Sequence, residues 1–342
     1  MQDQSPDLHR TDVAVIGAGP VGLFAIFECG MLRMRCHVID TLDAPGGQCT
    51  ALYPEKPIYD IPGYPRIDAA GLVDRLMEQA RPFHPAFHLG QQVTALDPTA
   101  DGGFRLATSA GATIEARAAL IAAGVGAFGP NRPPLPGIAA YEGRSVFYLV
   151  KRREDFRGKR VVVAGGGDSA VDWALSLADV AAHLYVVHRR GKFRAAPESV
   201  ARLEALAASG AVEMVAPYQL AGLEGADGQL KAVIVSTLDG RTRRLDADVL
   251  LPFFGLAMNL GPIAKWGLDH DRSHILVDPA SCASSAPGIF AIGDIAHYPG
   301  KLKLILTGFA EAAMAAHAIH PLLHPGAALH FEYSTTKGVP GL

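Results

Sequence analysis

Long apolar runs are missing from the sequence. No stretch approaches the ~20 consecutive apolar residues that cross a bilayer, and the polar start MQDQSPDLHR lacks the apolar centre of a secretory signal. We therefore expect a protein of the cytoplasm with no membrane partner.

Cysteine is scarce as well. Only Cys29, Cys36, Cys49 and Cys282 are present, with no C-x-x-C pair and no Cys/His spacing typical of zinc. This pattern argues against a disulfide framework and predicts no metal site.

A strong excess of either charge is also absent. The net charge is -3 and 19% of the residues are charged, which gives no reason to expect nucleic acid as a partner. The length of 342 residues and 49% hydrophobic content predict an ordinary globular protein of two domains.

Glycine, in contrast, is abundant at 37 residues, and part of it lies in a repeated pattern. In the first copy a strand, Val13–Ile16, runs into the turn Gly17–Gly22. A helical pattern extends to Met31, and a second strand, Cys36–Ile39, ends at Asp40. The order strand, glycine turn, helix, strand is typical of a dinucleotide-binding unit.

The second copy repeats this order. A strand, Val161–Ala164, runs into Gly165–Ala170, followed by a helical pattern over 171–178 and a strand, Leu184–Val187, that ends at His188. In such turns the first glycine permits the tight bend, the second lets the backbone approach a pyrophosphate, and the third position must be small. The predicted contacts from the two turns are Gly17, Gly19, Gly22, Gly165, Gly167, Ser169 and Ala170.

The residues after the second strand of each copy assign the cofactors. Asp40 can accept hydrogen bonds from a ribose diol and would repel a 2′-phosphate, so the first copy suits FAD or NAD. His188, Arg189 and Arg190 stand at the same offset in the second copy, where guanidinium groups suit the phosphate of NADP. A solvated basic turn is the alternative interpretation of these three residues.

The last third of the chain holds a buried strand, Gly288–Ile292, followed by Gly293 and Asp294. A Gly-Asp pair is also a common turn. A helix is predicted over about 304–319, and its N-terminal end suits the negative charge that develops when a flavin is reduced.

These observations predict an α/β fold with two Rossmann-like three-layer domains. A split FAD-binding domain, 1–128 and 256–342, would hold an inserted NADPH-binding domain, 129–255. The connections Gly126–Gly137 and Phe253–Asn259 are candidate hinges.

The chain resembles the thioredoxin-reductase-like branch of the pyridine-nucleotide flavoproteins, and within it the ferredoxin–NADP reductases. The segments that carry this resemblance are Gly46–Gln48, Ala51–Asp60, Gly165–Ala170, His188–Ala195, Gly293–Asp294 and Tyr333–Gly338.

The resemblance implies FAD and NADPH as cofactors, a homodimer and flavin-mediated chemistry without a catalytic acid or base. The FAD contacts that it implies are Val21, Asp40, Gln48, Val93, Phe128, Asp294 and Thr335. It also implies that Tyr53 and Tyr333 stack on the flavin, although both residue types are also common in ordinary packing.

One departure is informative. Thioredoxin reductases carry a C-x-x-C before the second glycine turn, whereas Ser145–Val150 contains no cysteine. Cys49 lies where glutathione-reductase-like enzymes begin their redox pair, but Pro54 occupies the partner position, so we interpret Cys49 as a buried small residue. The absence of a dithiol favours a one-electron partner, ferredoxin or flavodoxin.

Two further functions stay open: an NADPH diaphorase or oxidase that uses quinone or oxygen, and a non-catalytic flavin or NADPH sensor. Ferredoxins are typically acidic, so a basic docking face is expected. The candidates are the segment Lys151–Arg160 and the pair Lys301 and Lys303.

Overall fold

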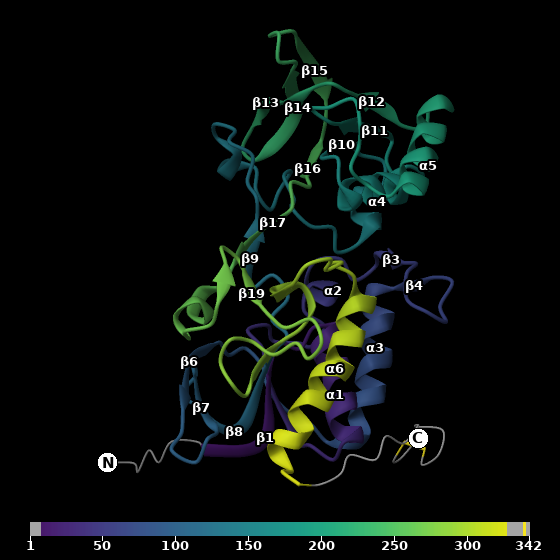
Figure 1. Ribbon diagram of the computed structural model, residues 1–342. Coiled ribbons are helices and arrows are strands. Elements are labelled where there is room, and N and C mark those ends of the chain that lie inside the picture. The colour runs from purple at the N-terminus through teal and green to yellow at the C-terminus, as the bar shows by residue number, and fades with distance from the viewer. Residues whose placement is uncertain (1–7, 327–337, 340–342) are drawn as a thin grey trace. The chain divides into compact units, whose positions relative to one another are not determined.

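A computed structural model describes residues 8–326 and 338–339, without the side chains of 127–130 and 256–258. The chain forms two compact units (Figure 1). Unit 1 combines Met1–Phe128 with Met258–Leu342, and unit 2 is the continuous segment Gly129–Ala257 that interrupts it. Among the helices of the described ranges, none is both long and apolar enough to cross a membrane.

A parallel sheet forms the centre of unit 1. Its strands are β5 (Ala86–His88), β2 (Cys36–Ile39), β1 (Leu8–Ile16) and β8 (Thr113–Ile121), in that order, and β20 (Ile289–Ala291) pairs with the end of β8. The first half of β8 also pairs with an antiparallel hairpin, β7 (Phe104–Thr108) and β6 (Val93–Pro98). The carboxyl ends of β1, β2 and β8 therefore meet at one edge, where ligands of parallel sheets bind.

Helices cover one face of this sheet. α1 (Pro20–Met31), α3 (Ala69–Ala80) and α6 (Ile305–Leu323) pack on Val13, Val15 and their neighbours (Figure 1). The opposite face carries a second apolar cluster around Ile16, Ile39 and Ile121. The smaller elements of unit 1 are α2 (Gln48–Ala51), β3 (Pro57–Ile58), β4 (Ile67–Asp68), η1 (Arg81–Phe83), η4 (Gly261–Lys265), β18 (His270–Asp271), β19 (His274–Leu276), η5 (Gly293–Ile295) and β21 (Ala296–His297).

Unit 2 is also layered. Its parallel sheet has the order β12 (Glu213–Val215), β11 (His183–Val187), β10 (Arg160–Ala164) and β16 (Val249–Pro252). The helices of this unit are α4 (Asp168–Leu177) and α5 (Pro197–Ala208).

An antiparallel sheet shares an apolar cluster with the parallel sheet of unit 2. Its strands are β13 (Gln219–Ala226), β14 (Gln229–Ser236) and β15 (Thr242–Asp246), and the cluster joins Val233 and Val235 to Val162 and Ala164. The remaining elements of unit 2 are η2 (Ile138–Ala140) and η3 (Arg153–Phe156). β9 (Ala127–Pro130) and β17 (Leu256–Asn259) lie where the chain passes between the two units, and they pair with each other.

The predicted α/β class with two Rossmann-like layered units is confirmed, but two elements are longer than predicted. β1 begins at Leu8 rather than Val13, because its polar first residues pair with β8 instead of entering a core. α6 continues past 319 to Leu323 and includes Pro321, whose missing N–H affects only the last turn.

Candidate dinucleotide sites

The glycine turn of unit 1 is shaped by close backbone contacts. A Cβ atom at Gly17, where φ is +115°, would lie 2.3 Å from the carbonyl oxygen of Ala122, and one at Gly22 would lie 2.0 Å from that of Gly17. A Cβ atom at Gly19, in contrast, would meet nothing within 4 Å. The first and third glycines therefore serve packing, and the second leaves open space beside the start of α1.

That open space faces a helix end suited to an anion. α1 begins after Gly19 with Pro20 at its first position, and no side chain caps it. Its first backbone N–H groups and the positive end of its dipole are thus available to a phosphate group.

Asp40 is fixed beside this turn. Its side chain is 9% exposed, and its two carboxylate oxygens accept from the backbone N–H of Ala18 at 2.6 Å and of Leu42 at 2.8 Å. Each oxygen keeps a lone pair, so the carboxylate can still accept from the hydroxyls of a ribose.

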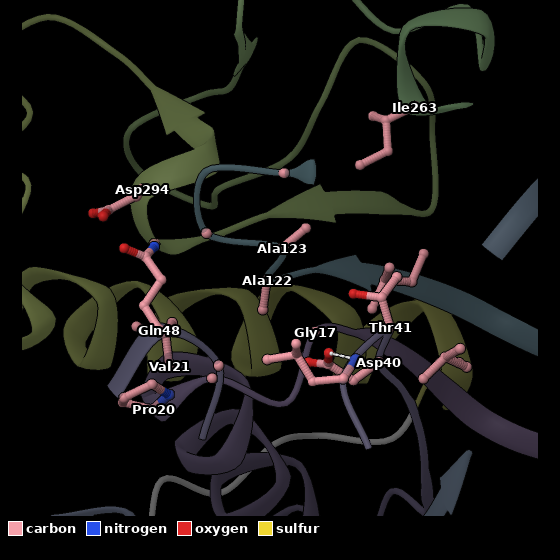
Figure 2. A pocket seen from close by; sticks show the side chains of 18 of the residues that line it. Gly17, Pro20, Val21, Asp40, Thr41, Gln48, Ala122, Ala123, Ile263 and Asp294 are labelled. Atoms are coloured by element: carbon pink, nitrogen blue, oxygen red, sulfur yellow. Dashed lines mark hydrogen bonds between the residues drawn. The ribbon is translucent and has the colours of Figure 1, made fainter. Parts of the chain in front are cut away.

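A cavity of about 590 Å³ extends from the glycine turn, within the usual range of ligand pockets. Figure 2 shows Asp40 and Thr41 toward one side of this pocket and Gln48 and Asp294 toward the other. The predicted FAD residues that line it are Gly17, Gly19, Val21, Asp40, Gln48, Tyr53, Val93 and Asp294. Of the other predicted residues, Gly22 is buried in the turn, the side chain of Phe128 is not described, and Tyr333 and Thr335 lie outside the described residues.

Two glycines let Val21 pack close to the Gly-Asp turn. A Cβ atom at Gly308, on α6, would lie 2.3 Å from the Val21 side chain, and one at Gly293 would lie 3.5 Å from it. The start of α6 lines the same cavity through Leu304 and Ile305. The predicted approach of this helix end to the pocket is therefore present.

Sequence reasoning missed a buried ionic cluster behind Asp294. Glu311 of α6 is 1% exposed and accepts from the backbone N–H of Gly293 and the hydroxyl of Tyr298, both at 2.7 Å. The Lys301 ammonium donates to the same carboxylate. This cluster joins the Gly-Asp turn to α6, and a lone glutamate in the otherwise apolar segment Gly308–Ala316 was the available signal.

Cys49 and Tyr53 lie together at the cavity wall. Burial raises the pKa of the Cys49 thiol to about 11, so this group is not a thiolate near neutral pH. Burial also raises the pKa of the Tyr53 phenol, whose ring has the Lys56 ammonium 5.5 Å from its centre. All four cysteines are free and buried, which agrees with the interpretation of Cys49 as a packing residue.

In the glycine turn of unit 2, as in unit 1, the first glycine is closely packed and the second faces open space. A Cβ atom at Gly165 would lie 2.6 Å from the carbonyl oxygen of Phe253 and 2.8 Å from the Cβ of Ala170. A Cβ atom at Gly167 would meet nothing within 4 Å, and no side chain caps α4, which begins after it. Ser169, in the first turn of α4, is exposed.

The basic segment after β11 is tied to this turn. The backbone N–H of Arg194 donates to Gly166 O at 2.7 Å, and that of Ala196 donates to Asp168 Oδ1 at 2.8 Å. Arg189 and Arg190 are exposed in the same segment. Two cations therefore lie on a segment that is anchored to the open helix end.

His188 has a different environment from the two arginines. The residue is 7% exposed, and its ring lies so close to Gly166 that a Cβ atom there would be 2.1 Å from His188 Cε1. Its Nε2 lies 3.2 Å from Lys192 O, and burial lowers its pKa. We therefore infer that His188 supports the turn by packing beneath it and adds no positive charge to the site.

The structure also revises the predicted docking residues. The Lys301 side chain is 3% exposed and paired with Glu311, so that part of the prediction is wrong. In Lys151–Arg160, four arginines form ion pairs with acidic neighbours: Arg152 with Asp155, Arg153 with Asp179, Arg157 with Glu154 and Arg160 with Asp248. Lys303 is exposed and lines the cavity.

Two glycine turns of the dinucleotide-binding type in one chain are typical of proteins that bind two dinucleotide cofactors. The family model described as pyridine nucleotide-disulphide oxidoreductase matches residues 11–317, and the chain belongs to this family.

Full-length relatives place it among the ferredoxin–NADP reductases. The protein of that name from Paramagnetospirillum magneticum is 65% identical over 332 residues, which cover 97% of this chain and 98% of the relative. Those of Rhodospirillum rubrum and Rickettsia akari are 65% and 56% identical, over 97% and 96% of this chain and 97% and 98% of their own lengths. The resemblance inferred from the motifs is thereby confirmed.

Solved structures show the same fold at low identity. Thioredoxin reductase of Lactococcus lactis superposes with a TM-score of 0.81 at 23% identity, over 92% of this chain and 99% of that chain. Bacillithiol disulfide reductase of Bacillus cereus gives 0.76 at 19% identity, over 91% and 99%. These likenesses concern the fold alone.

Proposed function

We propose that this chain is a ferredoxin–NADP reductase: an NADPH-dependent flavoprotein that binds FAD in unit 1 and NADPH in unit 2 and exchanges single electrons with ferredoxin or flavodoxin. One observation carries the assignment of cofactors. Two matching glycine turns have opposite chemistry beside them, a carboxylate in unit 1 and two exposed guanidinium groups in unit 2.

The residues of unit 1 fit FAD. The open space at Gly19 and the uncapped start of α1 would hold the pyrophosphate, and Asp40 would accept from the adenosine ribose. Asp294 and Gln48, toward the other side of the pocket, would face the flavin part (Figure 2). When bound, FAD supplies both the acceptor of hydride and the donor of single electrons.

The residues of unit 2 fit NADPH. The uncapped start of α4 beside Gly167 would hold the pyrophosphate, while Arg189 and Arg190 would bind the 2′-phosphate. The domain limits 1–128 with 256–342 and 129–255, and movement at the two connections, remain part of this proposal, as do a homodimer and a place in the cytoplasm.

Cysteine chemistry does not compete with a one-electron partner here. Disulfide reduction by a protein dithiol needs two cysteines close together, whereas the sequence has no C-x-x-C pair and Cys49 is a single buried thiol whose pKa burial raises to about 11. Ferredoxin or flavodoxin is therefore the acceptor class that best fits these residues.

The test is anaerobic. NADPH is added to the purified protein while the flavin absorbance is followed, and ferredoxin is then added with cytochrome c as the reporter. We expect rapid bleaching and ferredoxin-dependent cytochrome reduction. Bleaching without ferredoxin reduction would point to quinone or oxygen as the acceptor, and absence of bleaching would point to a sensor.

A further inference from the structure

Three histidines meet on the parallel sheet of unit 1, apart from the residues assigned above to FAD. His9 lies on β1, His37 on β2 and His88 on β5, which are adjacent strands in the order β5, β2, β1. One ring nitrogen of each lies within 4.8 Å of the others. The pairing of β2 with β5 brings His37 beside His88, and His9 meets them from the start of β1, ahead of the residues that pair with β2.

The rings form a compact group. His37 Nδ1 and His88 Nε2 are 2.9 Å apart, and the two ring centres are separated by 5.1 Å. The ring centre of His9 lies 4.7 Å from that of His88 and 5.6 Å from that of His37. Tetrahedral coordination with Zn–N bonds of 2.0–2.1 Å places ligand nitrogens about 3.3 Å apart. Small rotations of these side chains would therefore bring three nitrogens around one ion.

The chemistry of the three rings suits a cation. A neutral imidazole offers a nitrogen lone pair to a metal. The nearby positive charge of Arg35 is partly offset, because its Nε donates to Asp12 Oδ2 at 3.2 Å.

The ligand set indicates the class of ion. Mg²⁺ and Ca²⁺ prefer oxygen ligands, whereas imidazole suits Zn²⁺, Ni²⁺ and Cu²⁺. His88 is 9% exposed, and His9 and His37 are half-buried, which leaves a side open for a fourth ligand from water.

We propose that His9, His37 and His88 form a binding site for a divalent transition metal such as Zn²⁺, which joins β1, β2 and β5. The sequence did not predict it, because histidines on separate strands show no ligand spacing. The backbone connects this group to the residue assigned to the FAD ribose: Asp40 follows β2, and its backbone N–H donates to His88 O at 3.1 Å. Bound metal would therefore stabilise the strand ends that hold Asp40.

The test is isothermal titration of the FAD-bound protein with Zn²⁺, after treatment with EDTA and dialysis. We expect one Zn²⁺ per chain. His9→Gln and His37→Gln should each weaken binding at least about tenfold, since changes even at residues that only orient a ligand cost 10–100-fold. His270→Gln is the matched control, because His270 is exposed on β18 outside the group.

Two further readouts keep the test independent of activity. Zn²⁺ should raise the midpoint of thermal unfolding of the wild type and of His270→Gln, and leave that of His9→Gln unchanged. Co²⁺ should give ligand-field absorption beyond the flavin band in the wild type and lose it in His9→Gln. The proposal is overturned if the wild type binds no Zn²⁺, which would leave a hydrogen-bonded histidine pair only. It is also overturned if His9→Gln binds as tightly as the wild type, or if His270→Gln loses binding equally.

Discussion

The two units begin from one local pattern and use it differently. In both, the first glycine of the turn is pressed against a neighbouring strand end, and the second leaves open space at an uncapped helix. In unit 1, later segments that include Ala122–Gly124, Leu260–Trp266 and Gly293–Asp294 also surround this space and make a cavity. In unit 2, Asp168 and Ser169 beside the turn are exposed. The difference suits one cofactor that is retained and another that must enter and leave.

The residues that follow the second strand of each dinucleotide-binding motif also differ between the two units. Asp40 is buried, and its carboxylate accepts from the backbone N–H of Ala18 in the glycine turn and of Leu42 beyond the strand. His188, in contrast, packs under its turn and is followed by two exposed arginines. The same position in the motif therefore carries a buried carboxylate in one unit and a packed histidine in the other. The exposed cations of unit 2 lie one or two residues further along the chain.

The largest expected effect comes from filling the open space in each unit. Gly19 (φ −69°, ψ 177°) and Gly167 (φ −99°, ψ −179°) have extended backbones that accept a side chain. Gly19→Val should fold but bind FAD more than about 100-fold more weakly, because a bulky group would displace at least two phosphate contacts. Gly167→Val should keep its flavin and raise the KM for NADPH by a similar factor.

Each of these variants is the control for the other. Flavin content is measured by absorbance after gel filtration, and the KM for NADPH by steady-state kinetics with ferricyanide. A yellow Gly19→Val protein, or a colourless Gly167→Val protein, would contradict the assignment of cofactors to the two units.

The next effect compares one ion pair from each unit: Lys301–Glu311 of unit 1 is buried, and Arg160–Asp248 of unit 2 is half-exposed. Glu311→Gln would leave the Lys301 ammonium buried without its carboxylate, so the free energy of unfolding of unit 1 should fall by about 3–5 kcal/mol. Asp248→Asn breaks the half-exposed pair with Arg160 in unit 2 and should cost about 1 kcal/mol or less.

Hydrogen exchange followed by mass spectrometry measures this difference unit by unit. Peptides of α6 should lose protection in Glu311→Gln and keep it in Asp248→Asn. Equal losses of protection in the two variants would show that the buried pair does not stabilise unit 1 more than the half-exposed pair stabilises unit 2.

This ion pair also marks where sequence reasoning reached its limit. The glycine turns, Cys36–Ile39 and Asp40 could be predicted because the turn, the strand and the carboxylate are coded within a short segment. Glu311, Lys301 and Gly293 meet only through the packing of α6 on the Gly-Asp turn, so the lone glutamate of that helix gives no indication of its partners.

Burial also explains the other differences between the expectations from the sequence and the structure. From its residue type, Lys301 is expected to be a surface cation, but its side chain is 3% exposed. His188 is expected to be a phosphate ligand, but its ring fills the space beside Gly166. The half-polar start of β1 gives no apolar pattern because its pairing with β8 is made by the backbone. Residue type alone does not distinguish these cases, because the deciding partner comes from a distant segment.

A smaller effect tests the arginines that distinguish unit 2. Arg189→Ala removes a charged hydrogen bond worth about 1.5–3 kcal/mol, so the KM for NADPH should rise roughly ten- to a hundredfold while kinetics with NADH stay unchanged. Arg202→Ala, an exposed arginine on α5 of the same unit, is the control and should change neither. Equal use of NADPH and NADH by the wild type would contradict the phosphate assignment.

The smallest effect is expected at Cys49. All four cysteines belong to unit 1, and of these Cys49 lines the cavity assigned to FAD. Since burial raises the pKa of Cys49 to about 11, its thiol is held in the unreactive form, and Cys49→Ala should change the rate of ferredoxin reduction by less than about twofold. The measurement is ferredoxin-dependent cytochrome c reduction, with flavin content as the control for folding. A large loss of rate in a variant that keeps its flavin would show that the thiol takes part in electron transfer, and unit 1 would then do more than hold the cofactor.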